Sequence, residues 1–182
     1  DWPLHGAFAA AGYASCRLDV RGTGSSEGIA EDEYTEREIV DNLAVVKPTF
    51  MGAAPRIFEK AYGRISTMMA AEGGVKAKLF DMASEVGREV SVLREQGKNP
   101  SGMLSLKYSV TDKIIGTKIR DRFGGRIRFF ISGSAALNND IARWFDAMGM
   151  QILEGYGMTE TSAASFVARP RGYRYGTVGW PL

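Results

Sequence analysis

The residues best suited to chemistry lie between Glu154 and Glu160, directly after an apolar run at 150–153. Two glycines flank Tyr156 in this stretch, and a glycine lets backbone approach a ligand closely because it has no Cβ. The tyrosine ring offers a flat face for a base, Thr159 offers a hydroxyl for a phosphate oxygen, and Glu160 offers a hard oxygen ligand for Mg²⁺. This combination fits a magnesium nucleotide, although a polar loop with a half-buried tyrosine is the simpler interpretation.

A strand, a helix and a second strand are expected over residues 126–153. The run at 126–132 is rich in Ile and Phe, and a helix carrying Trp144 and Phe145 follows it, with Asn138, Asn139 or Asp140 as its cap. So short a unit joins parallel strands, whose carboxyl ends form the edge where open sheets bind ligands. The turn at 133–135 and the turn expected after 153 should therefore face one crevice.

Three helices are expected ahead of this unit, which makes the chain an α/β protein. The first runs from Pro55 to the Gly73–Gly74 pair, the second spans about 75–96, and the third spans about 104–123 and stops at Gly124. A short apolar segment at 50–54 is predicted to be a buried strand or turn. Helical spacing predicts core positions on the second and third helices: Leu79, Met82, Ala83, Val86, Val90, Leu93, Val110, Ile114, Ile115 and Ile119.

Composition excludes several classes of protein. The chain has 182 residues, 45% hydrophobic and 24% charged, and its single cysteine suits a reducing compartment without an internal disulfide. No apolar run reaches the roughly 20 residues of a membrane helix. Six basic residues cluster between 113 and 128, but acidic residues interrupt them, so a solvated face is favoured over a nucleic-acid site: Lys113, Lys118, Arg120, Arg122, Arg126 and Arg128.

Three motifs in one order resemble the adenylate-forming (AMP-binding) superfamily. The stretch at 156–160 resembles its YGxTE signature, 132–137 resembles the upstream Gly/Ala turn, and 176–181 resembles the downstream GxxGxP stretch. Residues 48–51 and 55–60 resemble a segment of long-chain fatty acyl-CoA synthetases. The resemblance covers about residues 39–182 and implies part of the large N-terminal adenylating domain, built around the parallel βαβ unit.

The resemblance also implies a site and a reaction. A fatty acid would be adenylated by ATP with Mg²⁺, and coenzyme A would then take the acyl group. Thr159 would bind the α-phosphate and Glu160 the Mg²⁺, and both would be catalytic. The residues implied to hold the nucleotide are Gly133, Ser134, Ala135, Glu154, Gly155, Tyr156, Gly157, Met158 and Thr159.

Residues 1–37 resemble a different family, the cocaine-esterase-like α/β-hydrolases. The string at 24–28 matches the G-x-S-x-G pattern around Ser26, but the only histidine, His5, lies upstream, so a surface turn is favoured over a nucleophile elbow. Thr23 begins a stretch that mimics a phosphate-binding loop without its lysine. We therefore predict two units, 1–37 and 38–182, joined by fusion or by an assembly artefact. The net charge changes sign at about the same place. Residues 1–46 contain nine acidic and three basic residues, whereas residues 47–182 contain twelve acidic and twenty basic residues.

Two other functions remain open at this stage: a serine hydrolase fragment and a non-catalytic α/β binding module. The chain opens at Asp1 without methionine and stops at Leu182, so both ends are expected to be cut. The pyrophosphate loop and the later ribose, hinge and lysine positions that the resemblance implies are missing from the sequence. We expect a cytoplasmic protein without nucleic-acid partners, with peripheral membrane contact as an alternative, and we expect it to be inactive alone.

Overall fold

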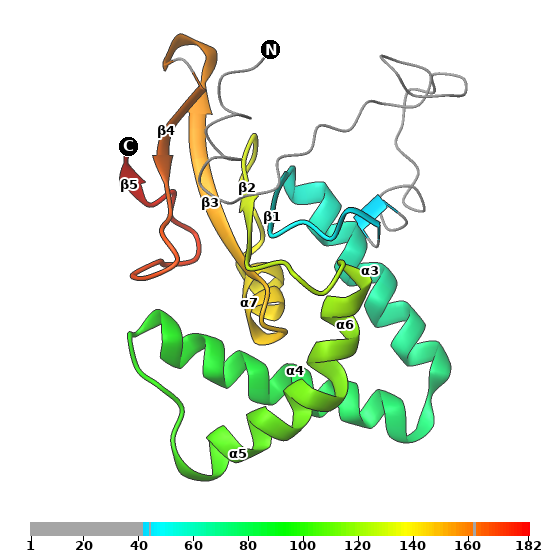
Figure 1. Cartoon of the computed structure of the whole chain (residues 1–182). Coiled ribbons are helices and arrows are strands. Elements are labelled where there is room, and N and C mark those ends of the chain that lie inside the picture. Colours follow the sequence, from blue (N-terminus) through cyan, green and yellow to red (C-terminus); the bar gives the residue numbers. More distant parts are fainter. Residues whose placement is uncertain (1–41, 44, 162) are drawn as a thin grey trace, which may run out of the picture.

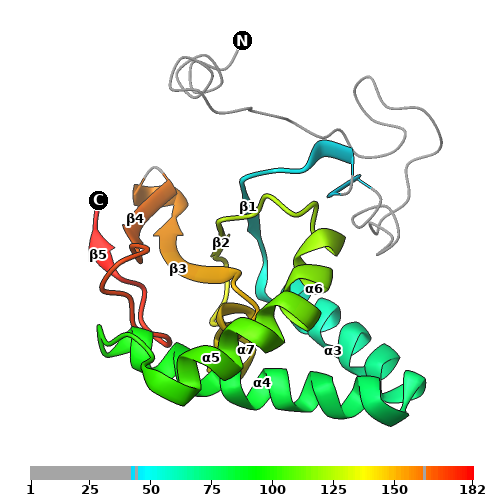
Figure 2. The ribbon, with the colours of Figure 1, turned by 60° about the horizontal axis from the view of Figure 1, so that its bottom comes forward.

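The computed structural model describes residues 42–43, 45–161 and 163–182, so the predictions for residues 1–37 lie outside the described part. Its five strands form one sheet in the order β1-β2-β3-β4-β5, and helices gather on one side of it (Figures 1 and 2). This arrangement confirms the predicted α/β class. The strands are β1 (Phe50–Ala53), β2 (Phe129–Ser132), β3 (Gln151–Met158), β4 (Ala163–Val167) and β5 (Trp180–Pro181). β1, β2 and β3 pair in parallel, whereas β4 pairs antiparallel with both β3 and β5.

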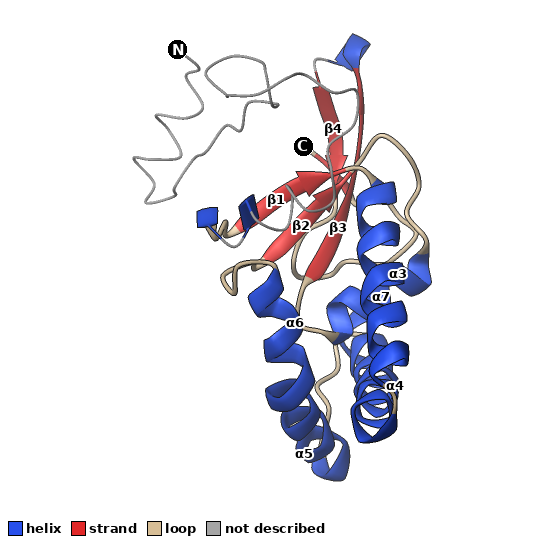
Figure 3. Cartoon of the chain, turned by 90° about the vertical axis from the view of Figure 1, so that its right-hand side faces the viewer, coloured by secondary structure: helices blue, strands red, loops and turns tan. Residues whose placement is uncertain are grey.

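The predicted βαβ unit is present as β2, α7 (Asn139–Ala147) and β3. β2 and β3 pair in parallel up to Ser132 and Glu154, and Figure 3 shows them side by side with β1. Of the three capping candidates, Asn138 is the cap, since its side chain accepts a hydrogen bond from the Asp140 N–H at 2.8 Å. The strand predicted from residue 126 begins only at Phe129, where pairing with β1 starts.

The helices upstream follow the predicted order: α3 (Pro55–Glu72), α4 (Gly74–Glu95), α5 (Gly102–Thr111) and α6 (Thr117–Arg122). Gly73 separates α3 from α4, and both Gly73 and Gly74, the first residue of α4, have the positive φ that glycine permits. The third predicted helix differs from a regular α-helix, because the π-helical turn Asp112–Gly116 joins α5 to α6. Such turns insert an extra residue into a helix and change the direction of the side chains that follow.

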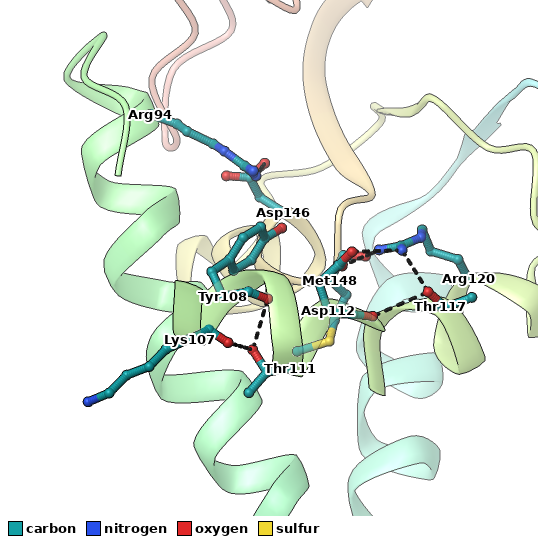
Figure 4. Close-up of polar contacts among 9 residues, drawn as sticks. All are labelled: Arg94, Lys107, Tyr108, Thr111, Asp112, Thr117, Arg120, Asp146 and Met148. Atoms are coloured by element: carbon teal, nitrogen blue, oxygen red, sulfur yellow. Dashed lines mark hydrogen bonds and ion pairs between the residues drawn. The ribbon is translucent and has the colours of Figure 1, made fainter. Parts of the chain in front are cut away.

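Arg120 fastens the helix after this π turn to the end of α7 (Figure 4). Its guanidinium bonds both carboxylate oxygens of Asp112, at 2.5 and 3.0 Å, and also donates to the Met148 carbonyl at 2.8 Å. A cation at a helix C-terminus is favourable because the last carbonyls lack partners within the helix. Gly149 leaves room for this contact, since a Cβ there would lie 2.7 Å from the guanidinium. Arg120 therefore does not belong to a solvated basic face, contrary to the prediction.

A cluster of aromatic rings fills the space between the sheet and the helices. Phe130 of β2 meets Phe58 of α3 and Phe145 of α7 edge to face, with ring centroids 5.2 and 6.0 Å apart. Phe123 and Trp144 extend the cluster with edge-to-face contacts to Phe145 at 5.9 and 5.1 Å. Edge-to-face pairs contribute beyond the area they bury, so these rings fix how α7 lies on the strands.

The predicted apolar stripe of α4 is buried at Ala83, Val86 and Val90, but not at Met82. Met82 is 50% exposed. In the third predicted helix, Ile115 and Ile119 are buried as predicted, whereas Val110 and Ile114 are exposed. The contact line of α4 also includes Gly87, where a Cβ would come within 2.5 Å of the Ala147 Cβ on α7. Met82 lies five residues before Gly87, which is about 140° around the helix. The close approach of α4 to α7 thus turns Met82 toward solvent.

Gly87→Ala should destabilise the fold by about 1–3 kcal/mol, because the added methyl has no room against Ala147. Gly63 in α3 is the matched control, since a Cβ there would meet nothing within 4 Å. Gly63→Ala should stabilise the chain by roughly 0.5–1 kcal/mol through helix propensity. Urea unfolding of both variants tests this, and equal effects of the two substitutions would contradict the packing described.

Candidate functional site

The turn that follows β2 lies against β3. Ser132 pairs with Glu154 at the last position of the parallel ladder, and a Cβ built on Gly133 would lie 3.4 Å from the Gly155 carbonyl oxygen. Ser134 has φ +72°, an unusual value for a residue other than glycine and one that is often found at functional sites. The two predicted segments, 133–135 and the start of 154–160, therefore do meet at one edge of the sheet.

The predicted turn at Gly155–Gly157 is wrong, because β3 continues as a strand to Met158. β4 supplies partners for this extension, pairing antiparallel from Gly155 opposite Val167 to Met158 opposite Ala163. The register shifts between Tyr156 and Gly157, which marks a bulge of the kind that redirects side chains. The chain reverses only in the 3-10 turn Thr159–Thr161.

The remaining predicted site residues lie along this extension. Tyr156 is 47% exposed and its ring is tilted against Phe166, 6.3 Å away. Thr159 and Glu160 are exposed in the 3-10 turn, which joins β3 to β4 beyond the ends of β1 and β2 (Figure 1). At about 3.3 Å per residue, they lie roughly 15 Å beyond Glu154. The structure thus brings 133–135 to Gly155 but leaves Thr159 and Glu160 at a distance from them.

Hydroxyl groups close the tip of this hairpin. Thr161 donates from Oγ1 to the Met158 carbonyl at 3.0 Å, and Ser165 donates to Thr161 Oγ1 at 2.7 Å. These bonds give hydrogen-bond partners to the Met158 carbonyl and the Thr161 hydroxyl where the strand pairing ends. The turn that carries Thr159 and Glu160 is therefore held at its base.

Glu154 is turned inward, with only 8% of its surface exposed. Its Oε2 accepts from the Leu137 N–H at 3.4 Å, and its Oε1 accepts from the Gly176 N–H at 3.0 Å. The carboxylate thus joins the turn after β2, the strand β3 and the segment before β5.

Aromatic and charged groups fasten the segment at 169–179 to the helices. The Tyr173 hydroxyl donates to Asp146 Oδ2 at 3.1 Å, and the Tyr175 N–H donates to Glu95 Oε1 at 3.1 Å. Arg94 extends toward Asp146 in Figure 4, with 3.9 Å between nitrogen and oxygen. Burial, followed by the Asp146 charge, raises the pKa of Tyr173 well above its usual range. The raised pKa keeps the Tyr173 phenol protonated, and donating to Asp146, up to a higher pH than an ordinary tyrosine.

Sequence reasoning missed these anchoring residues. Asp146 gave no periodic signal, because on the predicted helix it projects about 100° or more away from each of Trp144, Phe145 and Met148. A charge is rarely buried unless it is paired. Its partners, Tyr173 and Arg94, are distant in the sequence and could not be found by spacing.

An open groove of about 710 Å³ lies between α4 and α5, lined by Glu85, Arg88, Glu89, Val92, Leu93 and Leu104. It is remote from the predicted nucleotide residues, and we assign it no role in their chemistry. Within the described residues, no group of three or more His, Cys, Asp or Glu side chains is placed to hold a metal ion.

Comparison with known proteins assigns a family. A profile described as AMP-binding enzyme matches residues 23–182. The chain belongs to the AMP-binding enzyme family. This confirms the resemblance drawn from the motifs. The match begins at residue 23, inside the stretch that resembles a hydrolase, so residues 23–37 also fit the AMP-binding profile; the boundary at residue 37 stays a prediction.

The similar proteins of this family are much longer than the chain. It is 32% identical over 146 residues to the long-chain-fatty-acid–CoA ligase FadD15 of Mycobacterium bovis, covering 80% of the chain and 24% of that protein. It is 32% identical over 126 residues to long chain acyl-CoA synthetase 6, peroxisomal, of Arabidopsis thaliana, covering 69% and 16%. A solved structure of the anthranilate CoA ligase AuaEII with anthranoyl-AMP matches with a TM-score of 0.45 at 16% identity, over 86% of the chain and 21% of that structure.

Gly179→Ala should be strongly destabilising, by about 3 kcal/mol or more. Gly179 has φ +81°, and a Cβ would clash with the backbone of Ala168, so the variant meets both backbone strain and overlap. Gly172, with φ +77° and nothing within 4 Å of its Cβ, is the control that isolates the strain. Gly172→Ala should cost about 1–2 kcal/mol. Chemical denaturation of both variants measures the difference, and a Gly179→Ala variant as stable as Gly172→Ala would refute this packing.

Proposed function

We propose that this chain is part of a long-chain fatty acid–CoA ligase and contributes the adenine and phosphate contacts of its adenylation site. The observation that carries the proposal is the contact of the 133–135 turn with Gly155 at the carboxyl edge of the parallel strands. That edge is where open parallel sheets bind nucleotides. Membership of the AMP-binding family and 32% identity to long-chain ligases give the chemistry.

The nucleotide would lie along the exposed part of β3. Adenine would stack on Tyr156, bracketed by Gly133, Ser134 and Ala135 on one side and by the backbone of 154–158 on the other. The phosphates would then extend toward Thr159 and Glu160 at the hairpin tip. The extended backbone of β3 supports this placement, because it separates Tyr156, which would bind the base, from Thr159, which would bind a phosphate, along the strand direction.

The proposed reaction has two steps. A fatty acid carboxylate attacks the α-phosphorus of ATP, forming an acyl-adenylate and releasing pyrophosphate. The thiol of coenzyme A, losing its proton, then attacks the acyl carbonyl and displaces AMP. In the first step the chain's own groups position the phosphate, with the Thr159 hydroxyl donating to an α-phosphate oxygen; positioning and charge stabilisation account for most catalysis of phosphoryl chemistry.

Glu160 is the residue that would hold Mg²⁺, together with oxygens of the substrate phosphates that Thr159 would bind. One carboxylate plus phosphate and water oxygens is a common set of ligands for this ion, so the absence of a three-residue cluster among the described side chains fits the proposal. When bound, Mg²⁺ supplies charge neutralisation on the phosphates. Glu160 is exposed at the tip and is free of competing packing against the core.

The partners proposed for the whole protein are the fatty acid, ATP and coenzyme A. None of the described helices is both long enough and apolar enough to cross a bilayer. We propose a cytoplasmic location, with peripheral membrane contact left to experiment; one relative carries the word peroxisomal in its name.

Tyr156→Ala should weaken binding of an acyl-adenylate mimic about tenfold or more, because stacking of a base on an aromatic ring contributes roughly 1–3 kcal/mol. Tyr156→Phe retains the ring and should bind as the unsubstituted chain does. Isothermal titration of the three proteins measures this. Equal affinity of the alanine and phenylalanine variants would rule out stacking on this residue, and failure of the unsubstituted chain to bind would overturn the proposed site.

The chain by itself should give no sustained acyl-CoA formation with Mg-ATP, palmitate and coenzyme A. Its sequence has no Ser/Thr/Gly-rich loop with a lysine for the pyrophosphate, and it spans 24% or less of the two ligases compared above. A coupled assay for AMP release measures turnover, with a full-length ligase as the positive control. Multiple turnovers by the 182-residue chain would show that the missing loop is dispensable.

A further inference from the structure

We infer that Glu154 is a positioning residue for the nucleotide: its carboxylate holds two turns in place and does not itself touch the ligand. The inference rests on the proposed function, since it concerns the same site. It replaces the direct adenine contact that motif position alone implies for this side chain.

The first support is the pair of hydrogen bonds that the carboxylate oxygens of Glu154 accept. Oε2 accepts from Leu137 at the end of the turn after β2, and Oε1 accepts from Gly176 in the segment before β5. Both donors are backbone N–H groups, and they belong to turns that are about forty residues apart in the sequence. A carboxylate has two acceptor oxygens and no proton to donate, so it can serve two N–H groups at once. Hydrogen bonds to a charged acceptor are stronger than neutral ones.

The second support is the position of Glu154 on β3. It is the last residue in the parallel ladder, opposite Ser132, and the next residue, Gly155, faces Gly133. Tyr156, two residues on, lies on the same side of the strand. Glu154 is 8% exposed whereas Tyr156 is 47% exposed. The carboxylate therefore lies below the surface that the tyrosine presents, and beside the turn that would enclose the base.

The third support is a second carboxylate acting on the next amide. Glu95, at the end of α4, accepts from the Tyr175 N–H at 3.1 Å, directly before the Gly176 N–H that bonds Glu154. Two consecutive N–H groups are thus held by two carboxylates from different elements. These bonds fix the segment at 175–176 relative to both the helix layer and the sheet. Because Glu154 also bonds Leu137, it fixes the distance between Gly176 and Leu137.

Glu154→Gln tests the inference, because the amide keeps the shape of the side chain but has one acceptor oxygen in place of two. Glu72→Gln is the matched control: it makes the same substitution in the exposed ion pair of Glu72 with Lys76, where α3 meets α4. Hydrogen exchange over peptides containing 133–137 and 174–177 is measured together with the affinity for AMP. Glu154→Gln should speed exchange in both peptides and weaken AMP binding, each by about tenfold, as expected for losing one charge-assisted hydrogen bond. Glu72→Gln should change neither the exchange of these peptides nor the affinity for AMP.

Each of the other possible results of this experiment would contradict a specific part of the inference. Weaker AMP binding with unchanged exchange would mean that Glu154 touches the nucleotide directly, and faster exchange with unchanged affinity would mean that the turns do not position it. If the unsubstituted chain does not bind AMP, the proposed function fails, whereas exchange still decides whether the carboxylate ties the turns together. Should Glu154→Gln fail to fold, Glu154→Asp, one methylene shorter, should loosen at least one of the two peptides.

Discussion

The parallel pairing of β2 with β3, in the register that sets Ser132 opposite Glu154, is the constraint on which the site depends. A shift of one residue would turn every side chain of β3 to the other side of the sheet. Glu154 would then no longer reach Leu137 and Gly176, and Ile152 would leave the core. The burial of Phe130 and Ile152, both at about 1% exposure or less, makes such a shift costly.

The helix α7 contacts both the sheet and the other helices, and so fixes the strands relative to the helix layer. Asn138 caps its first turn, Arg120 binds the carbonyl of Met148 just after its last, and Phe145 lies in the aromatic cluster beneath β2. α4 packs against it so closely that only glycine fits at 87. Because α4 also contributes Arg94 and Glu95, the helix layer reaches the segment at 169–179 as well as the sheet. The turns around the site are therefore held by a shared scaffold.

Much of this could be predicted from sequence, where the signal is local. Pro55, the Gly73–Gly74 pair and the cap at Asn138 mark helix ends through backbone rules that need no tertiary contact. The predicted turn at Gly155–Gly157 was wrong because glycines permit a turn but do not require one, and β4 offered a partner that extends the strand. The contacts of Glu154, and those of Asp146 with Tyr173, depend on residues distant in sequence, so that no periodicity revealed them.

The central claim is that the 133–135 turn and the 155–156 stretch form one nucleotide site. Titration of the ¹⁵N-labelled chain with AMP, followed by the amide signals of Gly133, Ala135, Gly155 and Tyr156, tests it most directly. The account predicts that all four signals shift along a single binding curve. Movement of one pair without the other, or two separate curves, would contradict it.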